Sequence, residues 1–149
     1  MKEQNEIEIR RTRFDDIKTI TEIENMSYPD PWSEKMFESE LHLDFSNFFV
    51  MLYSGEIIGY VCFWDIQNEA HLTNLTVRKQ FRGKGLGSKL LSYALERAVP
   101  LNDRKIFLEV RVNNLAAMRL YDKFGFKQIG IRKKYYSNRD DALVMEKTL

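Results

Sequence analysis

The hydrophobic and polar positions along the chain follow two periods, and each period predicts a kind of secondary structure. Alternating apolar and polar side chains, or a run of β-branched and aromatic residues, are typical of a strand. Seven such segments occur, at residues 7–10, 48–53, 57–64, 71–77, 105–112, 126–131 and 142–145. The short turns Ser54-Gly55 and Gln67-Asn68 predict that the second, third and fourth of these strands pair antiparallel.

Apolar residues three or four positions apart predict four helices. The first begins at Thr12, extends to about Met26 and buries Ile17, Ile20 and Ile23. The third spans residues 86–98, and Pro100 follows it. Its apolar face is formed by Leu86, Leu90, Leu91, Ala94, Leu95 and Ala98.

A rigid aromatic loop is predicted at residues 27–32, because Pro29 and Pro31 restrict themselves and the residues before them. Ser33 is a good N-cap for the second helix. That helix is expected to make apolar contacts through Met36, Phe37 and Leu41.

The fourth helix is predicted to open at Asn113-Asn114 and to end at Gly125, a residue suited to the position after a helix. Its apolar residues are Leu115, Met118, Tyr121 and Phe124.

Composition supports one domain, residues 1–149, that needs neither a metal nor a disulfide to form its core. Of the 149 residues, 44% are hydrophobic and 13% are aromatic. The single cysteine, Cys62, excludes an internal disulfide, and the two histidines, His42 and His71, offer no spacing for a zinc site.

Charge and hydropathy narrow the class of partner. The net charge of +1 argues against nucleic-acid binding through bulk charge. The first six residues include the charged side chains of Lys2, Glu3 and Glu6 and no apolar run, and no segment approaches the roughly 18 apolar residues of a membrane span. We therefore expect a metal-free cytoplasmic protein that binds neither nucleic acid nor membrane.

The segment Arg82-Gly83-Lys84-Gly85-Leu86-Gly87-Ser88 lies between a predicted strand and a predicted helix. Alternating glycines let a backbone approach an anion closely, and the N–H groups at a helix start then point at it. The segment therefore predicts a phosphate site, although a loop with helix-capping glycines would have a similar sequence. The dinucleotide pattern G-x-G-x-x-G and the Walker pattern both fail on spacing.

Two signatures resemble the GNAT superfamily of N-acetyltransferases. The first is Arg82-x-x-Gly85-x-Gly87. The second comprises residues 108–114, Ala116-Ala117 and Leu120-Tyr121-x-x-x-Gly125-Phe126. The resemblance implies an α/β (α+β) fold with a mixed, mostly antiparallel sheet of about seven strands and about four helices. A splayed strand pair would then form the acetyl-CoA cleft.

Further matches resemble one branch of this superfamily. Residues 31–35, residues 132–136 and Asp141-Ala142 are similar to the ribosomal-protein alanine N-acetyltransferases and to archaeal N-terminal acetyltransferases. Residues 28–31 and the short link after Tyr136 depart from the pattern of this branch, so the shape of the acceptor groove does not follow from the resemblance.

The resemblance also implies which residues hold acetyl-CoA. Main-chain groups would hold its arm and its pyrophosphate, and Asn114 would bond the arm from the opposite side. The full set is Leu75, Thr76, Val77, Arg82, Gly83, Lys84, Gly85, Leu86, Gly87, Ser88 and Asn114. For Asn114, a helix N-cap is an equal interpretation and does not exclude the other role.

Acetyl transfer to an amine requires a base, and a proton for the departing thiolate. Glu109, an acid in an apolar strand, is the expected base, with a pKa raised by burial. The alternative is a structural carboxylate paired with Arg111 or with a buried donor. Tyr121 is the expected general acid, and the alternative is core packing.

The acceptor groove is expected to include Trp32, Tyr135 and Tyr136, which could equally be loop anchors. His42, His71 and Cys62 receive no role.

The sequence thus indicates a monomeric acetyl-CoA-dependent acetyltransferase acting on a protein N-terminal α-amine, with the N-terminal alanine of a ribosomal protein as the acceptor that the branch implies. A GNAT enzyme for small amines or lysine side chains is one alternative. A regulatory module that binds acyl-CoA without catalysis is another, and the presence of both Glu109 and Tyr121 argues against it.

Overall fold

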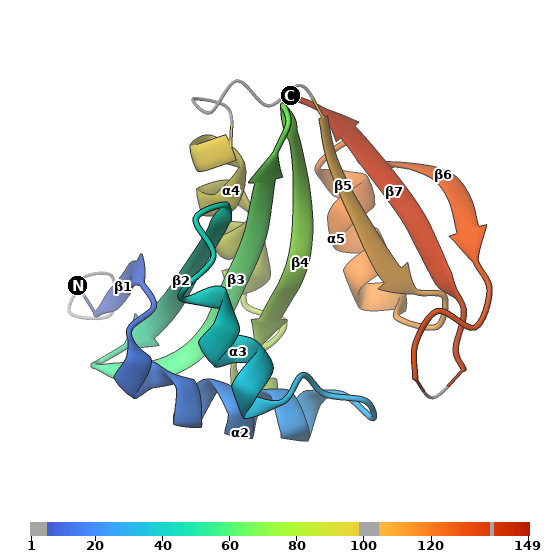
Figure 1. The fold of residues 1–149 in the computed structure, drawn as a ribbon. Helices are drawn as coiled ribbons and strands as arrows, with labels where there is room; N and C mark the ends of the chain where they lie inside the picture. The colour runs from blue at the N-terminus through green and yellow to red at the C-terminus, as the bar shows by residue number, and fades with distance from the viewer. Residues whose placement is uncertain (1–5, 99–104, 138) are drawn as a thin grey trace.

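The alternating segments of the chain form one sheet in the computed structural model, which describes residues 6–98, 105–137 and 139–149. Within these residues the sheet has seven strands in the order β1-β2-β3-β4-β5-β7-β6 (Figure 1). The strands are β1 (Ile7–Arg11), β2 (Ser46–Tyr53), β3 (Glu56–Ile66), β4 (Glu69–Val77), β5 (Lys105–Arg111), β6 (Lys127–Arg132) and β7 (Ala142–Thr148). All seven predicted strands are confirmed.

Four α-helices lie within the described residues, as predicted. They are α2 (Ile17–Ser27), α3 (Glu34–Glu40), α4 (Leu86–Ala98) and α5 (Leu115–Lys123). The side chains of Ser33 and Asn114 cap α3 and α5 as expected. No helix in the described part of the chain is long and apolar enough to cross a membrane. The predicted span of the third helix, residues 86–98, is confirmed in α4, and Pro100 after it lies outside the described residues.

The predicted start of the first helix at Thr12 is wrong. Residues 14–16 form a 3-10 turn, and α2 begins only at Ile17. The carboxylate of Asp16 accepts a hydrogen bond from the N–H of Arg13 at 2.7 Å and pairs with Arg10 at 2.8 Å. These local bonds hold the chain in a tight turn where a helix could otherwise have started.

Two side chains that were predicted to make apolar helix contacts are instead exposed. Met36 is 48% exposed, because the short helix α3 buries Phe37 and Glu40 instead. Leu115 is 59% exposed, and it is the first residue of α5.

The helices cover the two faces of the sheet unequally. On one face α4 and α5 pack against the central strands, and Leu90 and Tyr121 join Leu108 in one core cluster. On the other face α2 and α3 cover β2 and β3 through residues such as Ile20 and Phe37. Among the described residues no helix covers this second face of β5, β6 and β7 (Figure 1).

The sheet opens between β4 and β5. These two strands run parallel and pair only over Glu69–Leu72 and Lys105–Leu108, whereas every other strand pair of the described sheet is antiparallel. Beyond these residues the strands diverge (Figure 1). The expected splayed pair is therefore present.

Candidate active site

The glycine segment forms a turn whose amides point to no protein acceptor. Gly83 and Gly85 have φ values of +77° and +80°, a conformation that favours glycine. In the described part of the chain, none of the N–H groups from Gly83 to Ser88 donates a hydrogen bond to another residue. Because α4 begins at Leu86, the positive end of its dipole adds to these donors. The turn has the donors and the geometry of an anion site.

Two residues of this segment also have structural contacts. The Arg82 guanidinium donates to the carbonyl oxygen of Val77 at 2.8 Å and to Ser27 Oγ at 3.1 Å, so it ties the turn to the ends of β4 and α2. Gly87 lies in the first turn of α4, where an added Cβ would be 3.6 Å from Leu120 Cδ2 of α5.

The free edge of β4 provides further donors. The N–H of Arg78 bonds to the carbonyl of Ile58 on β3. In an antiparallel pair the residues alternate between bonded and non-bonded positions, so the N–H groups of Val77 and Leu75 face the edge that β5 has left. The same alternation turns the main chain of Thr76 toward β3. Two N–H groups are therefore available beside the splay.

Glu109 lies on β5, one residue beyond its last pair with β4, and its side chain is 9% exposed. Its Oε1 atom accepts from His71 Nε2 at 2.8 Å and from the Tyr135 hydroxyl at 3.4 Å. Arg111 pairs with Asp30 and Asp140, whereas the second suggested kind of partner, a donor held beside the carboxylate, is present. His71, which received no role from the sequence, is the donor.

The expected direction of the Glu109 pKa was wrong. Burial does act to raise this pKa, but the hydrogen bond and charge of His71, the charge of Arg132 and the hydroxyl of Tyr135 act against it. The net result is a pKa below the usual range. Glu109 is therefore ionised at neutral pH.

Tyr121 is 7% exposed and lies in the core cluster beneath the splay, with its ring edge-on to Phe126. Within the described residues no hydrogen bond contributes to the pKa of its hydroxyl. Burial, together with the nearby Tyr28 and Tyr136, raises its pKa. The hydroxyl therefore stays protonated at neutral pH. This environment is compatible with both interpretations of Tyr121, a side chain that packs in the core and a proton donor.

The remaining predicted residues make separate local contacts. Asn114 caps α5 by accepting from the N–H of Ala117 at 3.2 Å. Trp32 packs against Phe37, with 5.2 Å between ring centroids. Tyr135 is exposed and reaches Glu109, whereas the Tyr136 ring lies 3.9 Å from the Arg111 guanidinium.

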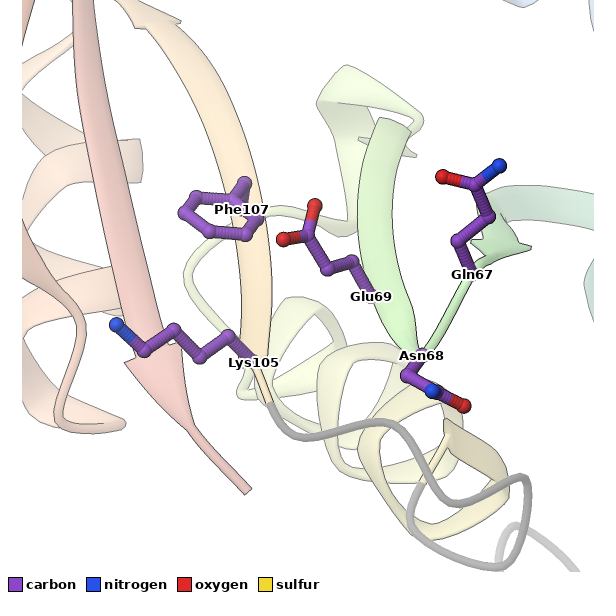
Figure 2. A pocket seen from close by; sticks show the side chains of 5 residues that line it. All are labelled: Gln67, Asn68, Glu69, Lys105 and Phe107. Carbon is purple, nitrogen blue, oxygen red and sulfur yellow. The ribbon is translucent and has the colours of Figure 1, made fainter.

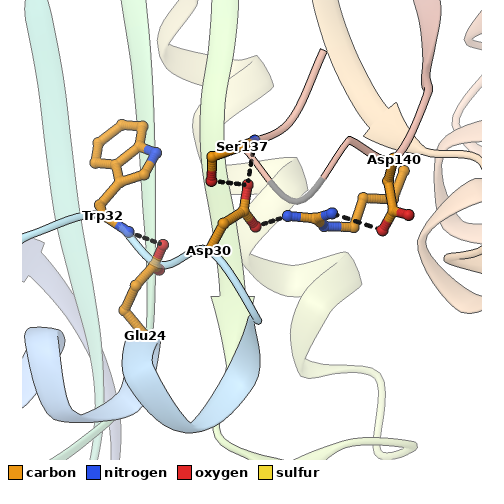
Figure 3. A network of polar contacts seen from close by, with 6 residues as sticks. Glu24, Asp30, Trp32, Ser137 and Asp140 are labelled. Atoms are coloured by element: carbon orange, nitrogen blue, oxygen red, sulfur yellow. Dashed lines mark hydrogen bonds and ion pairs between the residues drawn. The ribbon is translucent and has the colours of Figure 1, made fainter. Parts of the chain in front are cut away.

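A bridge that was not foreseen joins the loop after α2 to the link between β6 and β7. The N–H and hydroxyl of Ser137 both donate to Asp30 Oδ2 at 3.2 Å, and Asp30 also pairs with Arg111 (Figure 3). Arg111 in turn contacts Asp140 Oδ2 at 2.9 Å. The sequence gives no local signal for this bridge, because Asp30 and Ser137 are 107 positions apart.

The buried carboxylate of Glu24 binds groups of the α2–α3 loop and of β3 and β4. Glu24 accepts from the N–H of Trp32 at 3.0 Å (Figure 3), from the Tyr60 hydroxyl at 2.7 Å and from Asn74 Nδ2 at 3.1 Å. Tyr28 reaches β4 beside this group, with its hydroxyl 2.8 Å from Thr76 Oγ1 and 3.3 Å from the Leu75 carbonyl oxygen. These bonds hold the α2–α3 loop against the splayed end of β4.

One surface hollow lies away from the splay. A surface cavity of about 430 Å³ is lined by Gln67, Asn68, Glu69, Lys105 and Phe107 (Figure 2). It sits where β4 and β5 begin, at the paired end of the two strands, and contains none of the predicted site residues. We therefore place the candidate site at the splay. Among the described residues no cluster of His, Cys, Asp and Glu could hold a metal ion.

The chain is similar to known proteins over most of its length. The model of the acetyltransferase (GNAT) family matches residues 17–126. The chain is 37% identical, over 95% of each sequence, to a Bacillus subtilis strain 168 protein provisionally named ribosomal protein bS18-alanine N-acetyltransferase. It is 30% identical to an N-alpha-acetyltransferase of Sulfurisphaera tokodaii, over 97% of this chain and 94% of that protein. The crystal structure of the Escherichia coli ribosomal-protein-S18-alanine N-acetyltransferase superposes with a TM-score of 0.87 at 29% identity, covering 95% of this chain and 93% of that one.

Proposed function

Because the chain belongs to the GNAT family of acetyltransferases, we propose that it transfers an acetyl group from acetyl-CoA to the N-terminal α-amine of a protein. The names of its relatives support an α-amine acceptor, and we infer that the N-terminal alanine of ribosomal protein bS18 is that acceptor. The observation that supports the proposal is the splay of β4 and β5: Glu109 lies just beyond their last pair, and the amide-rich turn follows the far end of β4. A cytoplasmic location is part of the same proposal.

The glycine turn fits the pyrophosphate of acetyl-CoA. Its unpartnered N–H groups are donors for phosphate oxygens, and an added Cβ at Gly83 or Gly85 would meet nothing within 4 Å, so the space beside them is open. When bound, acetyl-CoA supplies an acetyl group activated as a thioester. The N–H groups of Leu75 and Val77 are placed to donate to an oxygen that gains negative charge.

Glu109 and Tyr121 divide the proton transfers between them in this proposal. The Oε1 atom of Glu109 is engaged by two donors, and no described residue donates to Oε2. Oε2 can therefore take a proton from the acceptor amine, directly or through water. The Tyr121 hydroxyl, kept protonated by burial, can give a proton to the departing sulfur.

The bridge at Asp30 supports an acceptor that enters as a chain end. It joins the two loops that would flank the acceptor, and Trp32 and Tyr135 lie on these loops. A terminus can enter beneath a closed bridge, whereas the middle of a chain would have to open it. This geometry favours an α-amine over a lysine side chain.

Acceptor peptides test the proposed function. Peptides with a free N-terminal alanine should react at least tenfold faster, in kcat/KM, than the same sequences with a blocked α-amine and an internal lysine, roughly the discrimination of one good contact. The measurement is acetyl incorporation located by mass spectrometry. Equal rates for the two sets would favour the lysine or small-amine alternative.

Gly85→Val should weaken acetyl-CoA binding at least about tenfold, or ~1.4 kcal/mol, because a β-branched residue at φ +80° distorts the turn that presents the amides. Isothermal titration with acetyl-CoA measures the change.

The matched control for this variant is Gly55→Val. Gly55 has φ +84° and open space around its Cβ position, but it lies in the β2–β3 turn. It carries the same backbone strain without touching the proposed site. Equal affinity losses in the two variants would contradict the assignment of the glycine turn to the pyrophosphate.

A further inference from the structure

The contact between His71 and Glu109 joins the two strands at the point where they separate. His71 is in the paired part of β4, opposite Phe107, whereas Glu109 is the first β5 residue beyond the pairing. Their side chains meet on the sheet face that no described helix covers over β5, with 2.8 Å between Nε2 and Oε1. This side-chain hydrogen bond therefore joins β4 to β5 where their main-chain pairing ends.

The chemistry of the pair determines where the proton lies. An ionised carboxylate can only accept, so the bond requires a proton on His71 Nε2, which both the Nε2-protonated neutral imidazole and the imidazolium provide. Trp64 of β3 contacts the imidazole edge-on, with 6.0 Å between ring centroids, and limits its rotation. His71 is 36% exposed on its outer side, so the donor is held without being fully buried.

The groups around Glu109 leave His71 as its shortest contact. Arg132 at the end of β6 is near Glu109, as are Tyr135 and Tyr136 in the link after β6. Of these three side chains only the Tyr135 hydroxyl reaches the carboxylate, at 3.4 Å. On β7, Val144 lies opposite, and Glu146, two residues on, pairs with Lys105.

The other strands and the bridge complete this environment. On β4, Glu69 lies two residues before His71. The neighbouring side chains of Phe107 on β5 and Trp64 on β3 carry no charge. Arg111 pairs with Asp30 in the bridge described above.

We propose that His71 is a positioning residue for acetyl transfer, whose Nε2–H holds Oε1 of Glu109 and leaves Oε2 as the oxygen that meets the acceptor amine. This inference rests on the proposed function. In this proposal the base is the Glu109 carboxylate, and one of its oxygens is held by His71 on β4. The separation of β4 and β5 that admits the substrates therefore also orients the base. The acceptor ammonium loses one proton to Oε2, and its nitrogen then forms the C–N bond to the acetyl carbon while the C–S bond breaks. The second proton of the nitrogen goes to water, and the Tyr121 hydroxyl protonates the departing thiolate and regains its own proton from water.

His71→Leu and His71→Gln separate positioning from packing. Leucine fills the space but donates nothing, whereas the glutamine amide can place an N–H close to the position of Nε2. The leucine variant lacks the donor that counteracts the effect of burial, so the Glu109 pKa should rise in this variant. In the glutamine variant the Glu109 pKa should stay near its value in the unmodified protein. Carbon-detected NMR of the Glu109 carboxyl measures this without any enzymatic turnover.

The pH–rate profile gives the second readout. Going from pH 8 to pH 5.5, kcat/KM of the leucine variant should fall about tenfold further than that of the unmodified protein, and the glutamine variant should recover most of the difference. His42→Leu, which changes the exposed histidine after α3, is the matched control and should follow the unmodified profile.

The two readouts distinguish the failure of this inference from failure of the proposed function. An unchanged Glu109 pKa in the leucine variant overturns the positioning role, whatever the acceptor proves to be. A raised pKa without a change in the pH–rate profile overturns both this role and that of Glu109 as the base. Loss of α-amine preference in the peptide experiment overturns the proposed acceptor alone. Thermal melts exclude unfolding as the cause of any rate loss.

Discussion

Glu109→Gln is expected to lower kcat/KM for an α-amine acceptor by roughly 10²–10³-fold at pH 7. An N-terminal ammonium has a pKa of about 8, so most acceptor molecules at pH 7 must lose a proton before they attack. Glu109 is ionised there because its pKa is lowered, and it can take that proton. The glutamine side chain can still accept from His71 but cannot act as a base. The defect should therefore shrink above pH 8, where the acceptor amine is increasingly neutral.

Glu146→Gln is the control for this variant. Glu146 is on β7 on the same sheet face, where it pairs with Lys105 at 3.6 Å, so its replacement makes the same change of charge away from the splay. Its kcat/KM should stay within about twofold of the unmodified protein, since a surface ion pair contributes little. A defect of Glu109→Gln that does not vary with pH would instead assign Glu109 a structural role.

Tyr121→Phe is expected to lower turnover by roughly 10²-fold while thermal stability and acetyl-CoA affinity hardly change. The ring would keep its contact with Phe126, and among the described residues no hydrogen bond to the hydroxyl contributes to its pKa. The effect lies at the low end for a general acid, because a thiolate with a pKa of about 8.5 is already a tolerable leaving group.

Steady-state rates and thermal melts on the same Tyr121→Phe protein separate the two interpretations of this residue. Tyr93→Phe is the control, since Tyr93 packs against Phe49 on the α4 side of the core and its hydroxyl is remote from β5. Near-normal turnover in a stable Tyr121→Phe protein would leave core packing as the role of this side chain. A large drop in melting temperature would indicate a structural partner for the hydroxyl.

Local pattern was sufficient for the elements of the fold. Strand and helix periods depend on neighbouring residues, so the predicted strand at 57–64 appears as β3, and the predicted apolar face of α4 is buried at Leu90, Leu91 and Ala94. The errors lie at the start of α2 and at two helical side chains that are exposed, Met36 in α3 and Leu115 in α5. At Asp16 a side-chain bond to the backbone displaced the start of α2. Met36 is exposed because periodicity does not specify how much of a short helix is covered.

The glycine turn could also be predicted from the sequence, because its conformation depends on glycine at particular positions. A backbone that turns with positive φ requires glycine whatever the rest of the fold does, and Gly83 and Gly85 both have that conformation. The signal for the splayed strands came through the resemblance to a family and not from the strands themselves. The roles of Glu109, Tyr121 and the acetyl-CoA residues remain predictions that the experiments above address.

By itself, the sequence determined the order of strands and helices, the caps at Ser33 and Asn114 and the position of the glycine turn, because each depends on residues close together in the chain. Only the tertiary structure decided which charged and polar groups meet. His71 and Glu109 are 38 positions apart on strands joined by a crossover, and their contact depends on strand order and register. That contact reverses the effect of burial on the Glu109 pKa, since a buried carboxyl takes its charge state from the donors that the fold brings to it.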